Sequence, residues 1–210
     1  MSNQQSPLFD DREAWLTEAA AVISDDIIAP ALPQGHAIPH PYRVSVGFPP
    51  RRRAGNKRTL AVCCVAEASA DLHNEIFVTP ELADPQQILA ALVHELIHQA
   101  DNCESGHRNF FAQVARRVGL DGKLTATTAG PELAPRLDEL AALLGPIPHA
   151  SLNIDQAAPK QSTRMIKVEC KRCGFHFRSS TKQLDRVDWP RATCPCCREW
   201  LGTLERADTL

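Results

Sequence analysis

The chain has 210 residues, a formal net charge of −2, 43% hydrophobic residues and 23% charged residues. These values are typical of a soluble globular protein with one domain of ordinary size and room for a small module. No apolar run approaches the roughly 20 residues that span a bilayer. Residues 1–7 also lack the basic and apolar segments of a signal peptide. We therefore expect a cytoplasmic protein without a membrane partner.

The amino-terminal part of the chain predicts one helix followed by a small sheet. Residues 11–28 have the apolar spacing of an amphipathic helix, whereas the proline-rich residues 30–41 predict an irregular loop. Strands are expected at 43–48, 60–65 and 75–79, which are apolar or alternate between apolar and polar residues. We expect Glu75–Thr79 to be an edge strand to which a substrate backbone could add.

The next predicted helix begins at Asp84, a favourable N-cap that precedes a proline. Residues 94–98 read HELIH, and His94 and His98 lie opposite the apolar half of this helix. Histidines four residues apart have Cβ atoms about 6 Å apart, which suits one tetrahedral zinc ion. Glu95 lies about 100° around the helix. It is therefore no third ligand on that face, but it could accept a proton from a water on the ion.

A third ligand has to come from another part of the chain. Positions 101 and 104 lack the glycine and histidine that the metzincin pattern requires. Glu132 or Glu139 could supply a carboxylate, but His107 is the better candidate. We expect His107 to open a helix whose stripe, including Phe111, packs inward. Three histidines with one open position make a catalytic zinc site, since structural sites are closed by four protein ligands.

The chain divides into two parts at a linker. We expect residues 8–148 to form one domain that ends in a helix over 135–144. Residues 149–163 have the composition of a linker, and residues 164–210 are left for a small second module.

Five of the eight cysteines lie between residues 170 and 197. Paired cysteines of this kind indicate metal binding in a reducing compartment more than secreted disulfides. Two CxxC pairs predict a zinc ribbon with one structural zinc ion on Cys170, Cys173, Cys194 and Cys197. Cys196 competes with Cys197 as the fourth ligand, and we favour Cys197 for its CxxC spacing. The few apolar residues here imply that metal supplies most of the folding free energy.

Charge is distributed unevenly between the two parts. Residues 1–159 carry a net charge of −7, and residues 160–200 carry a net charge of +6. Basic residues interleaved with Phe175, Phe177 and Trp189 suit contact with phosphates and stacking on bases. DNA is therefore a candidate partner of the ribbon and of the basic loop Arg51–Arg58. A solvated surface or a purely structural ribbon would explain the same residues.

The HELIH string, the pair Gly106-His107 followed by two phenylalanines, and the ribbon cysteines together resemble the SprT/Spartan group of zinc metalloproteases. The resemblance covers roughly residues 10–120 and 165–202. It implies an α+β fold, with a minimal zincin-like domain of helices and a small three-stranded sheet, followed by a zinc ribbon. It also implies zinc on His94, His98 and His107, with Glu95 as the catalytic base. Arg198 departs from the pattern, since a knuckle glycine is usual at that position.

Eukaryotic members of this group cleave proteins trapped on DNA, and DNA stimulates them. We therefore expect a zinc-dependent metalloendopeptidase that acts on protein substrates and associates with nucleic acid. The alternative is a non-proteolytic, nucleic-acid-binding zinc protein such as a transcription-related factor. An acid–base glutamate at position 95 would have no purpose in that alternative.

Overall fold

The computed structural model describes residues 8–48, 59–154, 156 and 165–200. The chain divides into two compact units, Met1–Ala157 and Ala158–Leu210. The fold is mixed α+β, as predicted. None of the helices in the described residues has the length and apolar character of a membrane span. The predicted basic loop Arg51–Arg58 lies outside the described residues.

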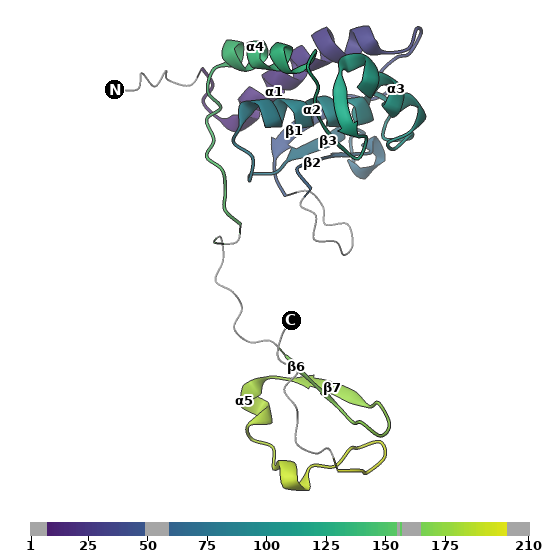
Figure 1. The fold of residues 1–210 in the computed structure, drawn as a ribbon, viewed down its shortest axis with the longest axis vertical. Helices are drawn as coiled ribbons and strands as arrows, with labels where there is room; N and C mark the ends of the chain where they lie inside the picture. The colour runs from purple at the N-terminus through teal and green to yellow at the C-terminus, as the bar shows by residue number, and fades with distance from the viewer. Residues whose placement is uncertain (1–7, 49–58, 155, 157–164, 201–210) are drawn as a thin grey trace, which may run out of the picture. The chain divides into compact units, whose positions relative to one another are not determined.

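The first unit contains a three-stranded sheet made of β1 (Tyr42–Val46), β2 (Ala61–Cys64) and β3 (Asn74–Val78) (Figure 1). The strand order is β1-β3-β2, with β1 parallel and β2 antiparallel to β3. The prediction that Glu75–Thr79 forms an edge strand is therefore wrong. β3 is the central strand, paired on both sides, and β2 forms the edge that lies beside the HELIH helix.

Helices pack on this sheet and on one another around a single core (Figure 1). α1 (Arg12–Ile23) contacts β1, and α2 (Pro85–Ala100) contacts β2 and β3. α4 (Ala134–Leu144) contacts α1 and α2. The apolar half of α2 is at most 1% exposed, as predicted, and consists of Ile88, Leu89, Leu92, Val93, Leu96 and Ile97. Burial of this half directs the HELIH histidines to the opposite side of α2.

The segment after α2 differs from the prediction in two ways. α3 (Asn109–Val118) begins only after His107, so His107 lies in a turn and does not open the helix. Asn102, Cys103 and Gly106 have φ angles of +50°, +62° and +54°, which do not occur within a right-handed helix, so the chain turns before it enters α3. A hairpin that we did not predict then follows α3. It consists of β4 (Leu120–Lys123) and β5 (Ala126–Ala129), and β5 contacts α2.

The start of the predicted linker is bonded to the first unit. The ring nitrogen Nε2 of His149 lies 3.0 Å from the carbonyl oxygen of Pro80. The N–H of Leu152 donates to the same oxygen at 2.8 Å. Residues 149–152 are therefore part of the first unit.

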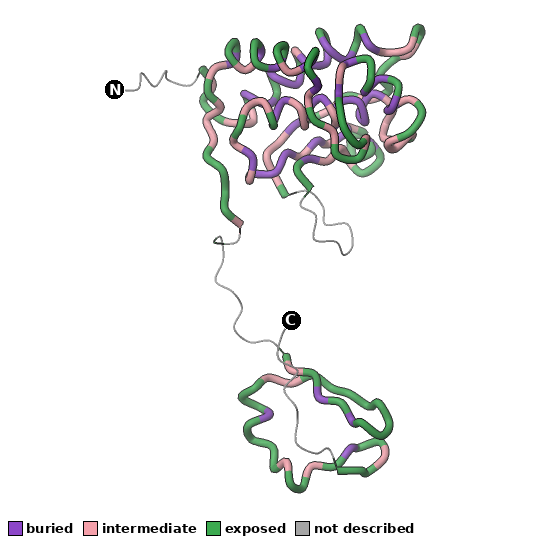
Figure 2. Tube along the Cα trace, in the orientation of Figure 1, coloured by how far each residue is buried: buried purple, intermediate pink, exposed green. Residues whose placement is uncertain are grey.

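The second unit is small and mostly exposed (Figure 2). It contains a hairpin of β6 (Ile166–Glu169) and β7 (His176–Ser179) and the short helix α5 (Thr181–Leu184). Its buried residues in the described range 165–200 are Val168, Cys170, Leu184 and Cys194. So few buried side chains do not make a sufficient core, which is the reason to expect a stabilising metal ion.

Candidate metal centres

α2 and the turn after it bring three imidazole rings together. Nε2 of His107 lies 3.2 Å from Nε2 of His94 and 3.3 Å from Nε2 of His98. The ligand atoms of a tetrahedral zinc ion with Zn–N bonds of about 2.0–2.1 Å lie about 3.3–3.4 Å apart. A shared proton satisfies one pair of nitrogens, whereas one cation accepts the lone pairs of all three. The three ring nitrogens therefore fit a metal ion. Each histidine offers one ligand atom, and these atoms all lie within 4.8 Å of one another.

The turn that carries His107 is held by Asn102. Its Oδ1 accepts hydrogen bonds from the N–H of Ala66 at 2.8 Å and from Nδ2 of Asn74 at 2.9 Å. Its Nδ2 donates to the carboxylate of Glu67. Asn102 has a φ of +50°, a conformation that asparagine tolerates better than most residues. These bonds tie the turn to the sheet, so His107 is positioned without being part of a helix.

Phe111, the first buried side chain of α3, packs against all three histidine rings. Its ring centroid lies 4.8 Å from that of His94, 4.4 Å from that of His98 and 5.1 Å from that of His107. The phenylalanine is fully buried. It forms an apolar wall that limits how far the imidazoles can rotate.

Burial keeps the three histidines neutral near pH 7. It lowers the pKa of His94 to about 4 and that of His98 to about 3, and the charge of neighbouring histidines acts in the same direction. Burial also lowers the pKa of His107. A neutral imidazole is the form that binds a metal ion, so protons compete little with a metal at this site.

Glu95 lies beside the histidine cluster and is not a member of it. Its side chain is buried, and Oε2 accepts a hydrogen bond from the backbone N–H of Cys63 on β2 at 2.7 Å. Burial raises the pKa of Glu95 to about 7, and the bond from Cys63 opposes that rise. A carboxylate with a pKa near neutrality suits proton transfer near pH 7.

Sequence reasoning missed Thr127, which lies on β5. Its Oγ1 is 2.8 Å from Nδ1 of His94. The short run Thr-Ala-Thr-Thr-Ala over 125–129 is a weak strand signal that could have indicated the hairpin, although not its contact with α2. The corresponding Nδ1 of His98 is buried and has no hydrogen-bond partner among the described residues.

The carboxylates considered as alternative third ligands lie elsewhere. Glu132 is exposed and lines a shallow surface groove beside Gly119. Glu139 lies on the exposed side of α4. Within the described residues, the group around His94 and His98 includes His107 and neither glutamate.

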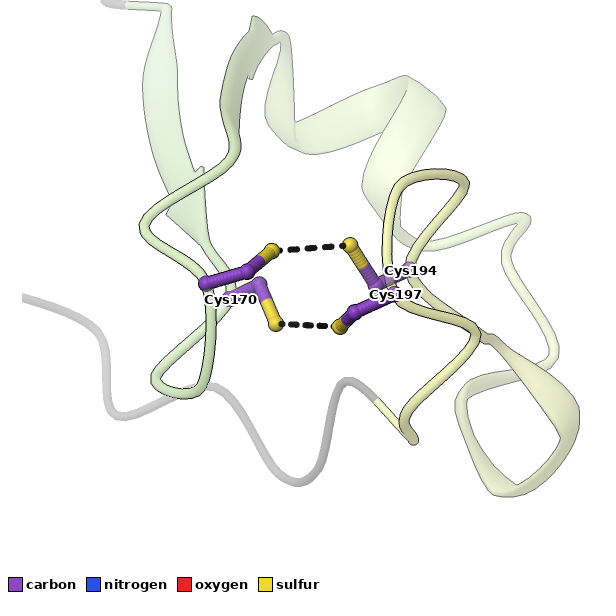
Figure 3. A group of neighbouring side chains, drawn as sticks. Cys170, Cys194 and Cys197 are labelled. Atoms are coloured by element: carbon purple, nitrogen blue, oxygen red, sulfur yellow. Dashed lines mark hydrogen bonds between the residues drawn. The ribbon is translucent and has the colours of Figure 1, made fainter.

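The second unit brings four cysteine sulfurs together. Sγ of Cys170 lies 3.6 Å from Sγ of Cys197, and Sγ of Cys173 lies 3.6 Å from Sγ of Cys194 (Figure 3). Sulfurs bound to tetrahedral zinc at about 2.3 Å are about 3.8 Å apart, so this set also fits a metal ion. Cys196 is exposed and lies outside the group.

The loop around Cys170 favours its ionised form. Backbone hydrogen bonds from Cys173 and Arg172 lower the pKa of Cys170 to about 7. A thiolate is the form that binds metal, so these backbone groups prepare Cys170 for that role.

Comparison with protein-family models, curated proteins and solved structures finds no match for this chain. Membership of the SprT/Spartan group therefore stays a prediction from the motifs. The two candidate centres are the observations from which a function can be inferred.

Proposed function

We propose that the first unit is a zinc-dependent metalloendopeptidase of the SprT-like type, with a minimal zincin fold, and that the second unit is a zinc ribbon. The observation that carries the proposal is the convergence of three Nε2 atoms from His94, His98 and His107 beside a buried carboxylate. Three neutral histidines leave one position of a tetrahedral ion open, as catalytic zinc sites do. The four cysteines would close the coordination of the other ion, as structural sites do.

Each residue of the first site has a chemical role in this proposal. Zinc, when bound by the three histidines, supplies a Lewis acid that acidifies a water molecule and polarises a peptide carbonyl. Glu95 accepts the proton of the attacking water and later delivers it to the leaving amine. The backbone N–H of Cys63 holds the Glu95 carboxylate at the edge of the sheet.

The edge strand β2 is the element that we propose to align a protein substrate. Thr79 directly follows β3, and its N–H donates a hydrogen bond to the carbonyl oxygen of Leu60 at 2.8 Å. The backbone groups of Leu60 therefore face β3. Backbone groups of an antiparallel strand alternate in direction, so those of Ala61 and Cys63 face away from β3. Cys63 is already bonded to Glu95, which leaves Ala61 as the position where an extended substrate chain could pair.

The basic ribbon is the part of the chain that could associate with nucleic acid. Phe175 and Phe177 are each 37% exposed, and their ring centroids lie 6.5 Å apart. Exposed aromatic rings on a basic module suit base stacking and phosphate contact. This observation also favours the second candidate function, a nucleic-acid-binding zinc protein without proteolytic activity.

The substitution Glu95→Gln separates the two candidates. We expect it to abolish cleavage of protein substrates, because an amide cannot accept the water proton, while two metal ions remain bound. The measurement is cleavage of an unfolded protein substrate by the full chain, with and without DNA, together with the metal content of each sample. A chelator-treated sample of the wild-type chain is the control for metal dependence.

His107→Ala is the matched test of the metal site, with Glu132→Gln as its control. The first variant should lose the metal ion of the first unit, and the second should keep both ions. Wild-type protein that binds DNA but cleaves no substrate would favour the second candidate. Unchanged cleavage by Glu95→Gln would refute the proposed role of that residue.

A further inference from the structure

We propose that Thr127 is a positioning residue that fixes the tautomer of His94. In this arrangement the Nδ1–H of His94 donates to Oγ1 of Thr127, so the lone pair of the ring lies on Nε2 and faces the other two histidines. The inference rests on the proposed function for the role of His94 as a metal ligand. The tautomer itself is a property of the metal-free chain.

The distances allow this hydrogen bond, and the role of His94 as a metal ligand favours it over the reverse arrangement. Nδ1 of His94 lies 2.8 Å from Oγ1 of Thr127, while Nε2 of His94 lies 3.2 Å from Nε2 of His107. A ligand histidine usually donates its second ring N–H to an acceptor, which sets both the tautomer and the orientation of the ring. The hydroxyl of Thr127 supplies such an acceptor.

His94 is held more closely than His98. Nδ1 of His98 is buried without a hydrogen-bond partner in the described part of the chain. The His98 ring is instead stacked on Phe111, with an interplanar angle of 25°. His94 is therefore the ligand whose donor atom is oriented by a polar contact, and His98 is oriented by packing.

The contact between Thr127 and His94 also connects the β4–β5 hairpin to the histidine site. Thr127 lies on β5, opposite Gly122 of β4, and β5 packs against α2. The neighbouring residue Thr128 lies on the opposite face of the same strand and is exposed. The chain thus offers two threonines in one strand, of which one contacts a candidate ligand.

The test compares Thr127→Val with Thr127→Ser and Thr128→Val in the full chain. Valine keeps the shape of threonine and removes the acceptor, serine keeps the acceptor, and Thr128→Val makes the same chemical change on the other face. We expect Thr127→Val to weaken metal binding at the first site by about 10- to 100-fold. The other two variants should bind metal as the wild type does. Titration with Co²⁺ separates the two centres, because only the ribbon gives thiolate charge-transfer bands, and competition with Zn²⁺ then gives the affinity.

A second measurement does not depend on metal. Nitrogen-15 chemical shifts of the histidine rings in the metal-free chain report which ring nitrogen carries the proton. We expect His94 to be protonated on Nδ1 in the wild type and to become a mixture of tautomers in Thr127→Val, with His98 unchanged.

The two proposals fail in different ways. A wild-type chain that binds Co²⁺ only in the ribbon would overturn the proposed function, and the nitrogen shifts would still decide the role of Thr127. Protonation of His94 on Nε2 in the wild type would overturn the inference. So would a Thr127→Val variant with the wild-type affinity, even if the chain were proved to be a protease.

Discussion

The carboxylate of Glu95 and the backbone N–H of Cys63 are joined by a hydrogen bond of 2.7 Å between the HELIH helix and the edge strand. The bond comes from a main-chain group, so a side-chain substitution at position 63 other than proline leaves the donor in place. It orients a carboxylate that is buried, where the charged form is costly. Burial outweighs the bond, and the pKa of Glu95 therefore lies at about 7.

The shifted pKa values of Glu95 and of the three histidines predict how the free energy of unfolding of the metal-free chain depends on pH. Between pH 6.5 and 4.5 the unfolded histidines 94 and 98 bind protons that the folded ones, with pKa values of about 4 and 3, do not bind. Acidification therefore lowers the free energy of unfolding, and His107 acts in the same direction. Glu95 has the opposite effect, because it is protonated below about pH 7 when folded but only below about 4.5 when unfolded.

Glu95→Gln removes the opposing contribution. We expect the free energy of unfolding of the metal-free variant to fall more steeply with acidification than that of the wild type, by about 1.4 kcal/mol per pH unit across this range. Urea unfolding followed by circular dichroism measures the difference, since α1 to α4 all lie in the first unit. Parallel slopes for the two proteins would contradict the raised pKa.

Asn102 is expected to contribute strongly to the stability of the turn before His107. Asn102→Ala removes the amide that bonds to Ala66, Asn74 and Glu67, and leaves the fully buried Asn74 without that partner. An unsatisfied buried polar group costs about 1–3 kcal/mol, and alanine at a φ of +50° adds about 1 kcal/mol.

Asn102→Gly separates these two contributions, because glycine accepts the backbone angle but supplies no amide. Stability measured by urea unfolding should decrease from wild type to Asn102→Gly to Asn102→Ala. Equal stability of the glycine variant and the wild type would show that the hydrogen bonds contribute little.

Phe111→Leu should weaken both the core and the metal site. The substitution keeps an apolar side chain but removes an aromatic ring that contacts three imidazoles, and such contacts contribute about 0.5–1.5 kcal/mol each. The three contacts together give an expected loss of about 1.5–4.5 kcal/mol in stability, with a lower affinity for Co²⁺. Phe110→Leu is the matched control, because the ring of Phe110 packs against His36, whereas the ring of Phe111 contacts the three ligands. An effect on metal affinity as large as that of Phe111→Leu would contradict the proposed wall.

Substitution of a ribbon cysteine is predicted to change the number of metal ions that the chain binds. Cys197→Ser should lose one bound metal ion per chain, whereas Cys196→Ser should lose none, because only Cys197 belongs to the group of four sulfurs. Loss of the ion should also unfold the β6–β7 hairpin, since the second unit has so small a core. Elemental analysis gives the metal count, and amide hydrogen exchange of residues 166–179 reports the hairpin. A metal ion lost from Cys196→Ser instead would reverse the assignment.

The sequence by itself determined the features that depend on local periodicity. The spacing of apolar residues showed which half of α2 is buried, and hence that His94 and His98 share the other side. The spacing within each CxxC pair likewise indicated which two sulfurs of one knuckle point the same way, and the structure brings the two pairs into one group. Residues a few positions apart are neighbours in any helix or knuckle, so their arrangement can be predicted without knowledge of the rest of the chain.

Only the tertiary structure decided which distant segments meet. The central place of β3, the turn that positions His107, and the contact of Thr127 with His94 join residues that are well separated along the chain. The spacing of apolar residues predicts which face of a helix or strand is buried, but it does not predict which other element covers that face. Strand order and the approach of a hairpin to a helix are set by how all the buried faces fit together, and that is a property of the folded chain alone.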